Sequence, residues 1–264
     1  MRRFFEAVGR NAVRRREALD GVFACIGEVF CRSVWLVFHP RRFRFGDFCL
    51  AFERAGFEGL PITVMIGLIL GVILAFESAA SLRSFGAEVY VADLVSIGLF
   101  RELGPLITAI ILAGRSGSAF AAEIGAMKVN EEIDALTTMG LPPVRFLVIP
   151  RIAAATLAMP FLTVAAEVSG LIGAAVVLRM VNVPTVVFWS HVASSTQCGV
   201  FAMGLGKAAL FGLLVALIGC ISGLRTRNTA DGVGVSATTA VVGGITAVAL
   251  ADGFIAVLCF LFGI

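Results

Sequence analysis

Residues 152–224 carry only three charged side chains, Glu167, Arg179 and Lys207. A water-exposed surface cannot be built from so few charges, because about a quarter of the residues of a typical soluble domain are charged. The same scarcity recurs in residues 59–76 and 232–251, which hold no charged residue. Since about 20 mostly apolar residues in a helix cross a hydrocarbon core of about 30 Å, the sequence predicts an all-α polytopic membrane protein.

Charge and length together predict five membrane spans. They are expected at about 61–81, 93–121, 152–179, 200–224 and 236–262, with residues 184–195 as an external connection. The first 59 residues contain eleven arginines against seven acidic residues. Because loops rich in Lys and Arg stay in the cytoplasm, we expect the N-terminus inside the cell and, after five crossings, the C-terminus outside.

The N-terminal region, residues 1–60, is predicted to form amphipathic helices at the cytoplasmic membrane surface. A single transmembrane domain then follows over residues 61–264. Residues 21–38 are apolar, but Glu28 and Arg32 lie four positions apart on one helix face. This pattern favours a helix in the plane of the interface over a full span. A soluble helical hairpin is the alternative for this region.

Two further patterns concern helix packing. Three phenylalanines at helical spacing predict a second amphipathic helix before the first span, namely Phe45, Phe48 and Phe52. Within the spans, small residues four positions apart let helix backbones approach closely in lipid. Close packing is therefore the preferred interpretation of two glycine pairs, Gly67 with Gly71 and Gly219 with Gly223.

Motifs for catalysis, metal binding and nucleotide binding are missing from the sequence. Lys207 follows two glycines, but Phe201 stands where a phosphate loop needs its first glycine, and no Ser or Thr follows the lysine. The six cysteines are scattered through apolar sequence and are expected to be small core residues. We therefore expect no catalytic residue, no metal, no cofactor and no nucleic-acid partner for this chain.

Residues 122–140 are the most charged stretch after the N-terminal region, and they lie between two spans on the expected cytoplasmic side. A helix is predicted over residues 122–136. Its acidic residues lack basic partners at helical spacing, so they are expected to point outward. A solvated connecting helix and a docking surface for another protein both fit this pattern.

Three segments resemble the MlaE family, also called YrbE, of ABC-transporter permeases that work with MCE proteins on phospholipid trafficking. They are RELGPLITAIILAGRSGSAFAAEIGAMKVNEEIDAL at 101–136, GLPITVMIGLILGVILAFE at 59–77 and DGVGVSATTAVV at 231–242. The resemblance covers roughly residues 58–264. This chain has Glu77 where the family commonly has Gln, and Pro142 where Asp is common.

The resemblance implies a homodimeric permease in the bacterial inner membrane that moves phospholipid and maintains the lipid asymmetry of the outer membrane. The implied partners are a cytoplasmic ABC ATPase dimer that binds ATP and Mg²⁺, a periplasmic MCE-domain protein and a STAS-domain subunit. The helix at 122–136 would be the coupling helix that docks on the ATPase. Its candidate contact residues are Glu123, Gly125, Met127, Lys128, Glu131, Glu132 and Asp134.

Charged residues inside the spans are the candidates for a lipid site. A charge at the bilayer centre costs at least about 2.5–3.5 kcal/mol unless it is paired or hydrated. We expect Glu102 to pair with Lys207 or Arg101 and to form a headgroup site in the outer-leaflet half. Acyl chains would lie against Leu70, Leu74 and Leu99, with Glu77 in the same cavity.

Four alternatives to the lipid site remain open. The charges could form a salt bridge that only ties helices together, or the span could begin later and leave them at the wet interface. An autonomous secondary transporter or channel would use Arg101, Glu102, Glu167 and Lys207 as an ion path, and an intramembrane scaffold would use none. The absence of an evident inverted repeat disfavours the secondary transporter.

Overall fold

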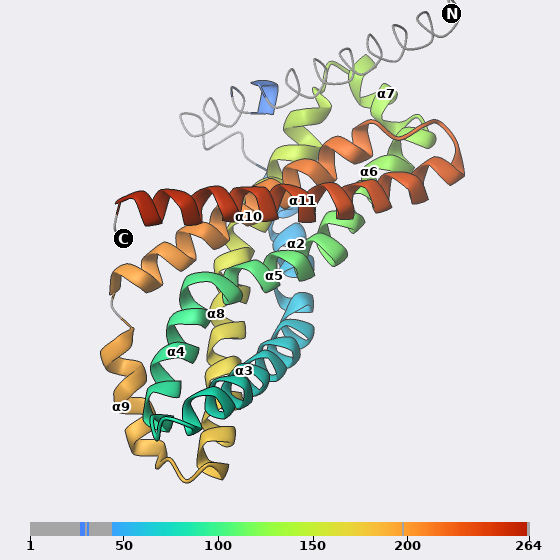
Figure 1. Cartoon of the computed structure of the whole chain (residues 1–264). Coiled ribbons are helices and arrows are strands. Elements are labelled where there is room, and N and C mark those ends of the chain that lie inside the picture. Colours follow the sequence, from blue (N-terminus) through green and yellow to red (C-terminus); the bar gives the residue numbers. More distant parts are fainter. Residues whose placement is uncertain (1–26, 30, 32–43, 197, 263–264) are drawn as a thin grey trace, which may run out of the picture.

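The computed structural model describes residues 27–29, 31, 44–196 and 198–262. Within them the chain forms helices and no strand, in the arrangement of Figure 1. The helix predicted over residues 21–38 falls largely outside these residues. The α-helices are α2 (Phe45–Ala55), α3 (Leu60–Arg83), α4 (Val91–Gly98), α5 (Gly104–Leu112), α6 (Ser118–Val129), α7 (Glu132–Thr138), α8 (Ile149–Met180), α9 (Thr185–Ser195), α10 (Cys198–Leu224) and α11 (Ala230–Phe262).

Short helical segments of other kinds join some of these helices end to end. Two are 3-10 turns, η2 (Phe57–Gly59) and η3 (Glu88–Tyr90). Three are π-helical, namely η4 (Leu99–Leu103), η5 (Ala113–Gly117) and η6 (Val144–Val148). A π segment widens one turn of a helix and often occurs at a functional site.

Five helical stretches are long and apolar enough to cross a membrane, as predicted. They are Phe45–Arg83, Glu88–Val129, Val144–Met180, Cys198–Leu224 and Ala230–Phe262. The all-α fold with five candidate spans is therefore confirmed. The amphipathic helix predicted from the phenylalanine spacing is also present, as α2.

α8 is the central helix of the bundle and packs against α2, α3, α5 and α10. The closest approach is to α3, where a side chain on Gly71 would overlap the carbonyl oxygen of Gly170. The second glycine pair lies against the second span, because a Cβ on Gly219 would be 2.7 Å from the carbonyl oxygen of Gly117. Close packing is thus confirmed for both glycine pairs.

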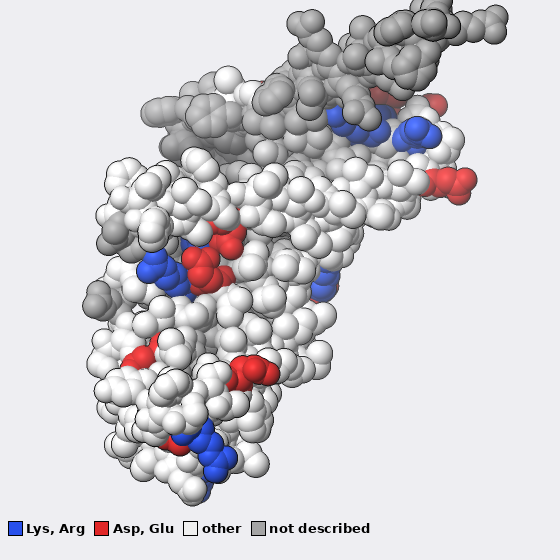
Figure 2. All heavy atoms as spheres, in the orientation of Figure 1, with Lys and Arg blue, Asp and Glu red and all other residues white. Residues whose placement is uncertain are grey.

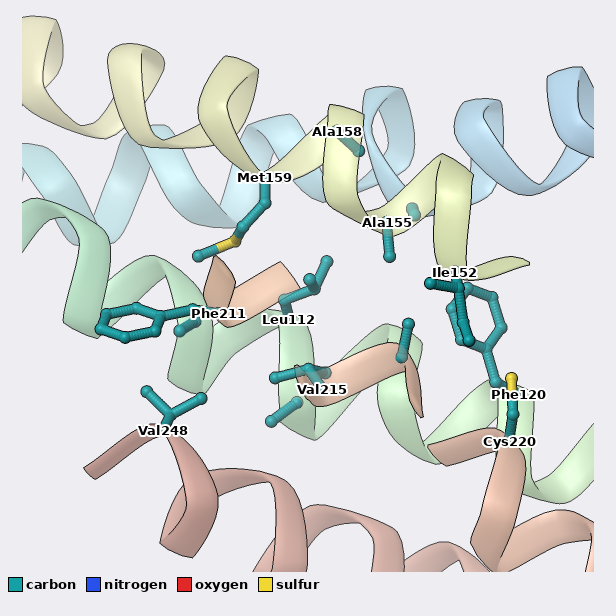
Figure 3. Close-up of a cluster of buried hydrophobic side chains, with 14 of the residues drawn as sticks. Leu112, Phe120, Ile152, Ala155, Ala158, Met159, Phe211, Val215, Cys220 and Val248 are labelled. Carbon is teal, nitrogen blue, oxygen red and sulfur yellow. The ribbon is translucent and has the colours of Figure 1, made fainter. Parts of the chain in front are cut away.

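Two clusters of buried apolar side chains fill the bundle. The larger one joins α5, α6, α8, α10 and α11, and Figure 3 shows Leu112, Met159, Phe211 and Val248 converging within it. The smaller cluster joins α3, α4, α8 and α9 around Leu99. The last helix contributes little to either cluster, since only 11% of its most apolar stretch of 18 residues is buried.

One of the two predicted connections differs from the structure. Residues 122–136 are not one helix, because α6 continues the second span to Val129 and the chain turns at Asn130 and Glu131 before α7. Glu131 adopts a left-handed backbone with φ 61°, which cannot continue a right-handed helix. Residues 184–195, predicted as a connection, lie between the third and fourth candidate spans and contain α9, which begins after an extended Pro184.

Candidate functional site

An ion-pair cluster lies inside the spans and is centred on Lys207 of α10. The Lys207 Nζ atom lies 2.5 Å from Glu102 Oε2 and 2.7 Å from Asp252 Oδ1. Only 2% of the Lys207 side chain is exposed, against 15% for Asp252 and 35% for Glu102. The cluster therefore joins η4, α10 and α11 through a buried cation and two acids that are partly open to the surface.

The local sequence explains why Lys207 is held at this place. Pro105 has no N–H group, so it cannot donate to the carbonyl of Arg101 four residues earlier. Lys207 Nζ donates to that carbonyl instead, over 3.3 Å. The π-helical turn at η4 brings Glu102 to the same ammonium group.

Figure 2 shows one face of the molecule. The described surface in this view is largely uncharged, and its charged atoms gather in only a few places.

The predicted pairing of Glu102 with Lys207 is present, and the sequence reasoning missed Asp252. The signal for Asp252 was available, because it is the only charged residue in the last predicted span, 236–262. Arg101 contributes its carbonyl oxygen to the cluster. The structure therefore supports a paired cluster in the spans, and its role in lipid binding stays a prediction.

Glu167, which the channel hypothesis grouped with these charges, lies elsewhere on α8. It is 1% exposed and packs against Gly104, where a Cβ would come within 2.9 Å of its Cγ atom. Its Oε2 atom makes no hydrogen bond within the described residues. The ion pairs of Lys207 among the described residues are with Glu102 and Asp252, and none is with Glu167.

The apolar residues predicted to contact acyl chains fall into two groups. Leu70 and Leu74 are half-buried on α3, and Glu77 is exposed one turn further along. Leu99 is a correction, because it is 1% exposed within the smaller core cluster and a Cβ on Gly170 would lie 3.0 Å from its Cδ1. Leu99 therefore has no free surface for a lipid chain.

The first half of the predicted coupling segment is engaged within the protein. Glu123 binds Arg54 of α2 at 2.8 Å and Arg151 of α8 at 3.0 Å. Lys128 Nζ donates to the carbonyl of Leu224 at 2.7 Å. The expectation that the acids of this segment all point outward is therefore wrong for Glu123. Its partners lie on other helices, so the spacing of charges within the segment could not reveal them.

Two other members of the set are also partly enclosed. Gly125 is buried, with a Cβ position 2.7 Å from Thr226 Oγ1. Met127 is half-buried beside a small pocket between α2, α6 and α8.

The second half of the segment is free to meet another protein. Glu131, Glu132 and Asp134 are exposed, at and after the turn that starts α7. In Figure 1, α6 and α7 lie at the end of the bundle where α10 turns into α11. This end therefore exposes three acidic side chains directly after α6, and the contacts of Glu123 and Lys128 hold α6 in place.

A sequence model described as the permease MlaE matches residues 48–258, which include both candidate sites and all of the candidate spans except the outer ends of the first and the last. The chain belongs to the MlaE permease family. This assignment agrees with the resemblance found in the three sequence segments. The family's members are membrane permeases, and the five apolar helices make this chain a multi-pass membrane protein.

Named relatives cover most of the chain. A probable ABC transporter permease protein of Synechocystis is 39% identical over 212 residues, which are 79% of this chain and 80% of the relative. The intermembrane phospholipid transport system permease protein MlaE of Haemophilus influenzae is 34% identical over 189 residues, 71% of this chain and 72% of its own. The chloroplastic protein trigalactosyldiacylglycerol 1 of Arabidopsis thaliana is 33% identical over 203 residues, 76% of this chain and 57% of its own.

Proposed function

We propose that this chain is the permease subunit of an ABC transporter that moves phospholipids between the inner membrane and a periplasmic MCE-domain protein. The observation that carries the proposal is the 34% identity to the intermembrane phospholipid transport permease of H. influenzae across the spans. Such transport would maintain the lipid asymmetry of the outer membrane. An autonomous transporter or channel is not favoured, because the relatives are named as ABC transporter permeases.

The energy source in this proposal is a separate cytoplasmic ATPase dimer that binds ATP and Mg²⁺. The lack of a phosphate loop in the sequence agrees with ATP hydrolysis by a partner. The exposed acids of the α6–α7 turn, Glu131, Glu132 and Asp134, would dock on basic residues of that ATPase. Glu123 and Lys128 would act indirectly, by bracing α6 against α8 and α10.

The transporting unit in this proposal is a homodimer with the N-terminus in the cytoplasm and the C-terminus in the periplasm. α11 carries exposed apolar side chains along its length, including Val242, Leu250 and Phe254. A second copy of α11 would cover part of this face, in keeping with the prevalence of two-fold symmetry among oligomers. The MCE-domain protein would sit on the periplasmic end, and a STAS-domain subunit would complete the assembly.

The lipid headgroup would bind near the cluster of Arg101, Glu102, Lys207 and Asp252. Glu102 is the more exposed of the two acids that pair with Lys207 and can exchange this contact for water or for a headgroup amine. Replacing Arg101 by Gln should lower photo-cross-linking of phospholipid to the spans and lower lipid transfer, with ATPase assembly unchanged. Unaltered cross-linking and transfer in this variant would place the headgroup elsewhere.

A charge-reversal experiment tests ATPase docking. The double variant Glu131→Lys/Glu132→Lys should insert normally but lose co-purification of the ATPase and lipid-stimulated ATP hydrolysis. Glu88→Lys, at the opposite end of the second span, is the control and should retain both. Normal assembly and turnover in the double variant would refute the docking surface.

A further inference from the structure

The elbow between α2 and α3, residues 54–60, is held by one side chain of the second candidate span. Arg115, in the π-helical turn η5, donates from Nη1 to the carbonyl of Arg54 at 2.8 Å and from Nη2 to Glu58 Oε2 at 2.7 Å. Arg54 belongs to the last turn of α2, and Glu58 belongs to the 3-10 turn η2 that follows. A single guanidinium group therefore ties both arms of the elbow to a different span.

Helix geometry explains why an arginine suits this position. The carbonyls in the last turn of a helix lack an N–H partner from a following turn, and positive charge near them is favourable. The guanidinium group carries its donors on a planar fork, so it can meet a carbonyl and a carboxylate at the same time. Arg115 therefore caps α2 and also holds the turn that starts the first membrane crossing.

A second contact joins the elbow to the same span further along the chain. Glu123 of α6 binds the Arg54 side chain at 2.8 Å. Arg115 and Glu123 are eight residues apart, which is about 12 Å at 1.5 Å per residue. Arg54 is thus held by its carbonyl at one level and by its guanidinium group at another. One contact would let the elbow pivot, whereas two contacts make it follow both the position and the rotation of the second span.

The exposure of the Arg115 contact separates its role from that of the buried core. The Arg115 side chain is 34% exposed and the Glu58 side chain 58%. Ion pairs with this access to solvent contribute little to stability, because water and salt screen them. The bundle should therefore fold without the pair, and the pair mainly fixes where the elbow lies relative to the second span.

We propose that Arg115 is a positioning residue that passes movements of the second span to the first. The inference rests on the proposed function, in which the ATPase docks on the exposed acids after α6. Because η5 and α6 belong to one continuous helical stretch, a displacement at the docking end reaches Arg115. α3 then runs without a break from the elbow past the residues predicted to contact lipid, Leu70, Leu74 and Glu77. Arg115 thus connects the ATPase end of the chain with the lipid site on α3.

The test uses the full chain with its ATPase and the MCE-domain protein in phospholipid vesicles. It measures the transfer ratio, which is the number of lipids transferred per ATP hydrolysed. Arg115→Met removes all donors of the side chain at similar length. We expect the transfer ratio to fall roughly tenfold while ATP hydrolysis stays within about twofold of the wild type, because single changes along a chain of contacts can alter coupling by such factors. Arg83→Met, at the opposite end of α3, is the control and should leave the transfer ratio unchanged.

Milder variants distinguish positioning from a general loss of structure. Glu58→Gln leaves the contact of Arg115 with the Arg54 carbonyl in place and should lower the transfer ratio only about threefold. Arg115→Lys keeps the charge but not the planar fork, so its transfer ratio should lie between those of Arg115→Met and the wild type. The double variant Arg115→Met/Glu58→Gln should match Arg115→Met, because Glu58 acts through Arg115.

Hydrogen exchange detects the movement itself. When the ATPase is trapped with ATP and vanadate, we expect amide exchange in the wild type to change both at the end of α6 and in the elbow. In Arg115→Met the change at the end of α6 should remain and the change in the elbow should disappear. A residue that only stabilised the fold would alter exchange in the elbow equally with and without trapping, and this result would refute the inference.

Two further outcomes would overturn the inference while the proposed function stands. One is a wild-type transfer ratio in Arg115→Met or, if that variant does not fold, in both Arg115→Lys and Glu58→Gln. The other is a double variant whose loss is the product of the two single losses, which would mean that Glu58 and Arg115 act independently. A wild-type chain that binds no ATPase or transfers no lipid would instead refute the proposed function, and this inference with it.

Discussion

Replacement of Lys207 by Met should destabilise the protein strongly, because it leaves two partly buried acids without their cation. Removing one partner of a buried ion pair costs about 3–5 kcal/mol. The cost here is assigned mostly to Asp252, which is 15% exposed, while Glu102 at 35% is partly screened by solvent. We therefore expect a loss of about 3 kcal/mol in the free energy of unfolding, at the lower end of that range.

The second variant in this test removes the acid as well. The double variant Lys207→Met/Asp252→Asn leaves no buried charge between α10 and α11. Its free energy of unfolding should therefore be about 2 kcal/mol higher than that of Lys207→Met. The assay is unfolding in mixed micelles with increasing dodecyl sulfate, followed by circular dichroism. Lys128→Met is the control, because Lys128 is half-buried and donates to a backbone carbonyl, a contact worth about 1 kcal/mol.

Two results would refute this reasoning. One is a loss below about 1 kcal/mol for Lys207→Met, which would mean that water or lipid solvates the acids fully. The other is a double variant no more stable than Lys207→Met, which would mean that the cost does not come from Asp252.

Three further predictions concern local structure. Gly71→Ala should abolish folding or lower the yield of folded protein severely, because its methyl group meets the backbone of α8, whereas Gly98→Ala has open space and should behave as wild type by size-exclusion chromatography. Glu131→Gly should raise the free energy of unfolding by about 1 kcal/mol by relieving a left-handed backbone, and an unchanged value would contradict this origin of the turn. Glu123→Gln should lower the free energy of unfolding by about 1–2 kcal/mol through loss of two ion pairs. An unchanged value would mean that solvent screens both pairs fully.

The number and approximate position of the spans followed from the sequence, because hydrocarbon thickness and the cost of burying charge act on short stretches of chain. Runs such as 59–76 and 232–251 contain no charged residue and fit the length of a span without reference to any neighbour. The glycine pairs were also interpretable, since close approach in lipid requires small residues wherever the partner helix lies.

The partners of the charged residues were predictable only in part. Glu102 and Lys207 were expected to pair because an isolated charge in a bilayer is costly. Asp252, the second acid on Lys207, comes from a helix 45 residues further along the chain. Glu123 likewise finds Arg54 and Arg151 on other helices, although nothing in its own segment neutralises it.

The sequence by itself determined that this chain is a five-span helical membrane protein, and the tertiary structure decided which face of each span is used. Helical periodicity does not say how far a helix is rotated about its axis when every face is apolar. Packing of α3 against α8 through Gly71 and Gly170 sets that rotation here. It buries Leu99 in the core. Only the packed bundle could bring Asp252 of α11 and Glu102 of η4 to the same ammonium group of Lys207, because these residues lie far apart in the sequence.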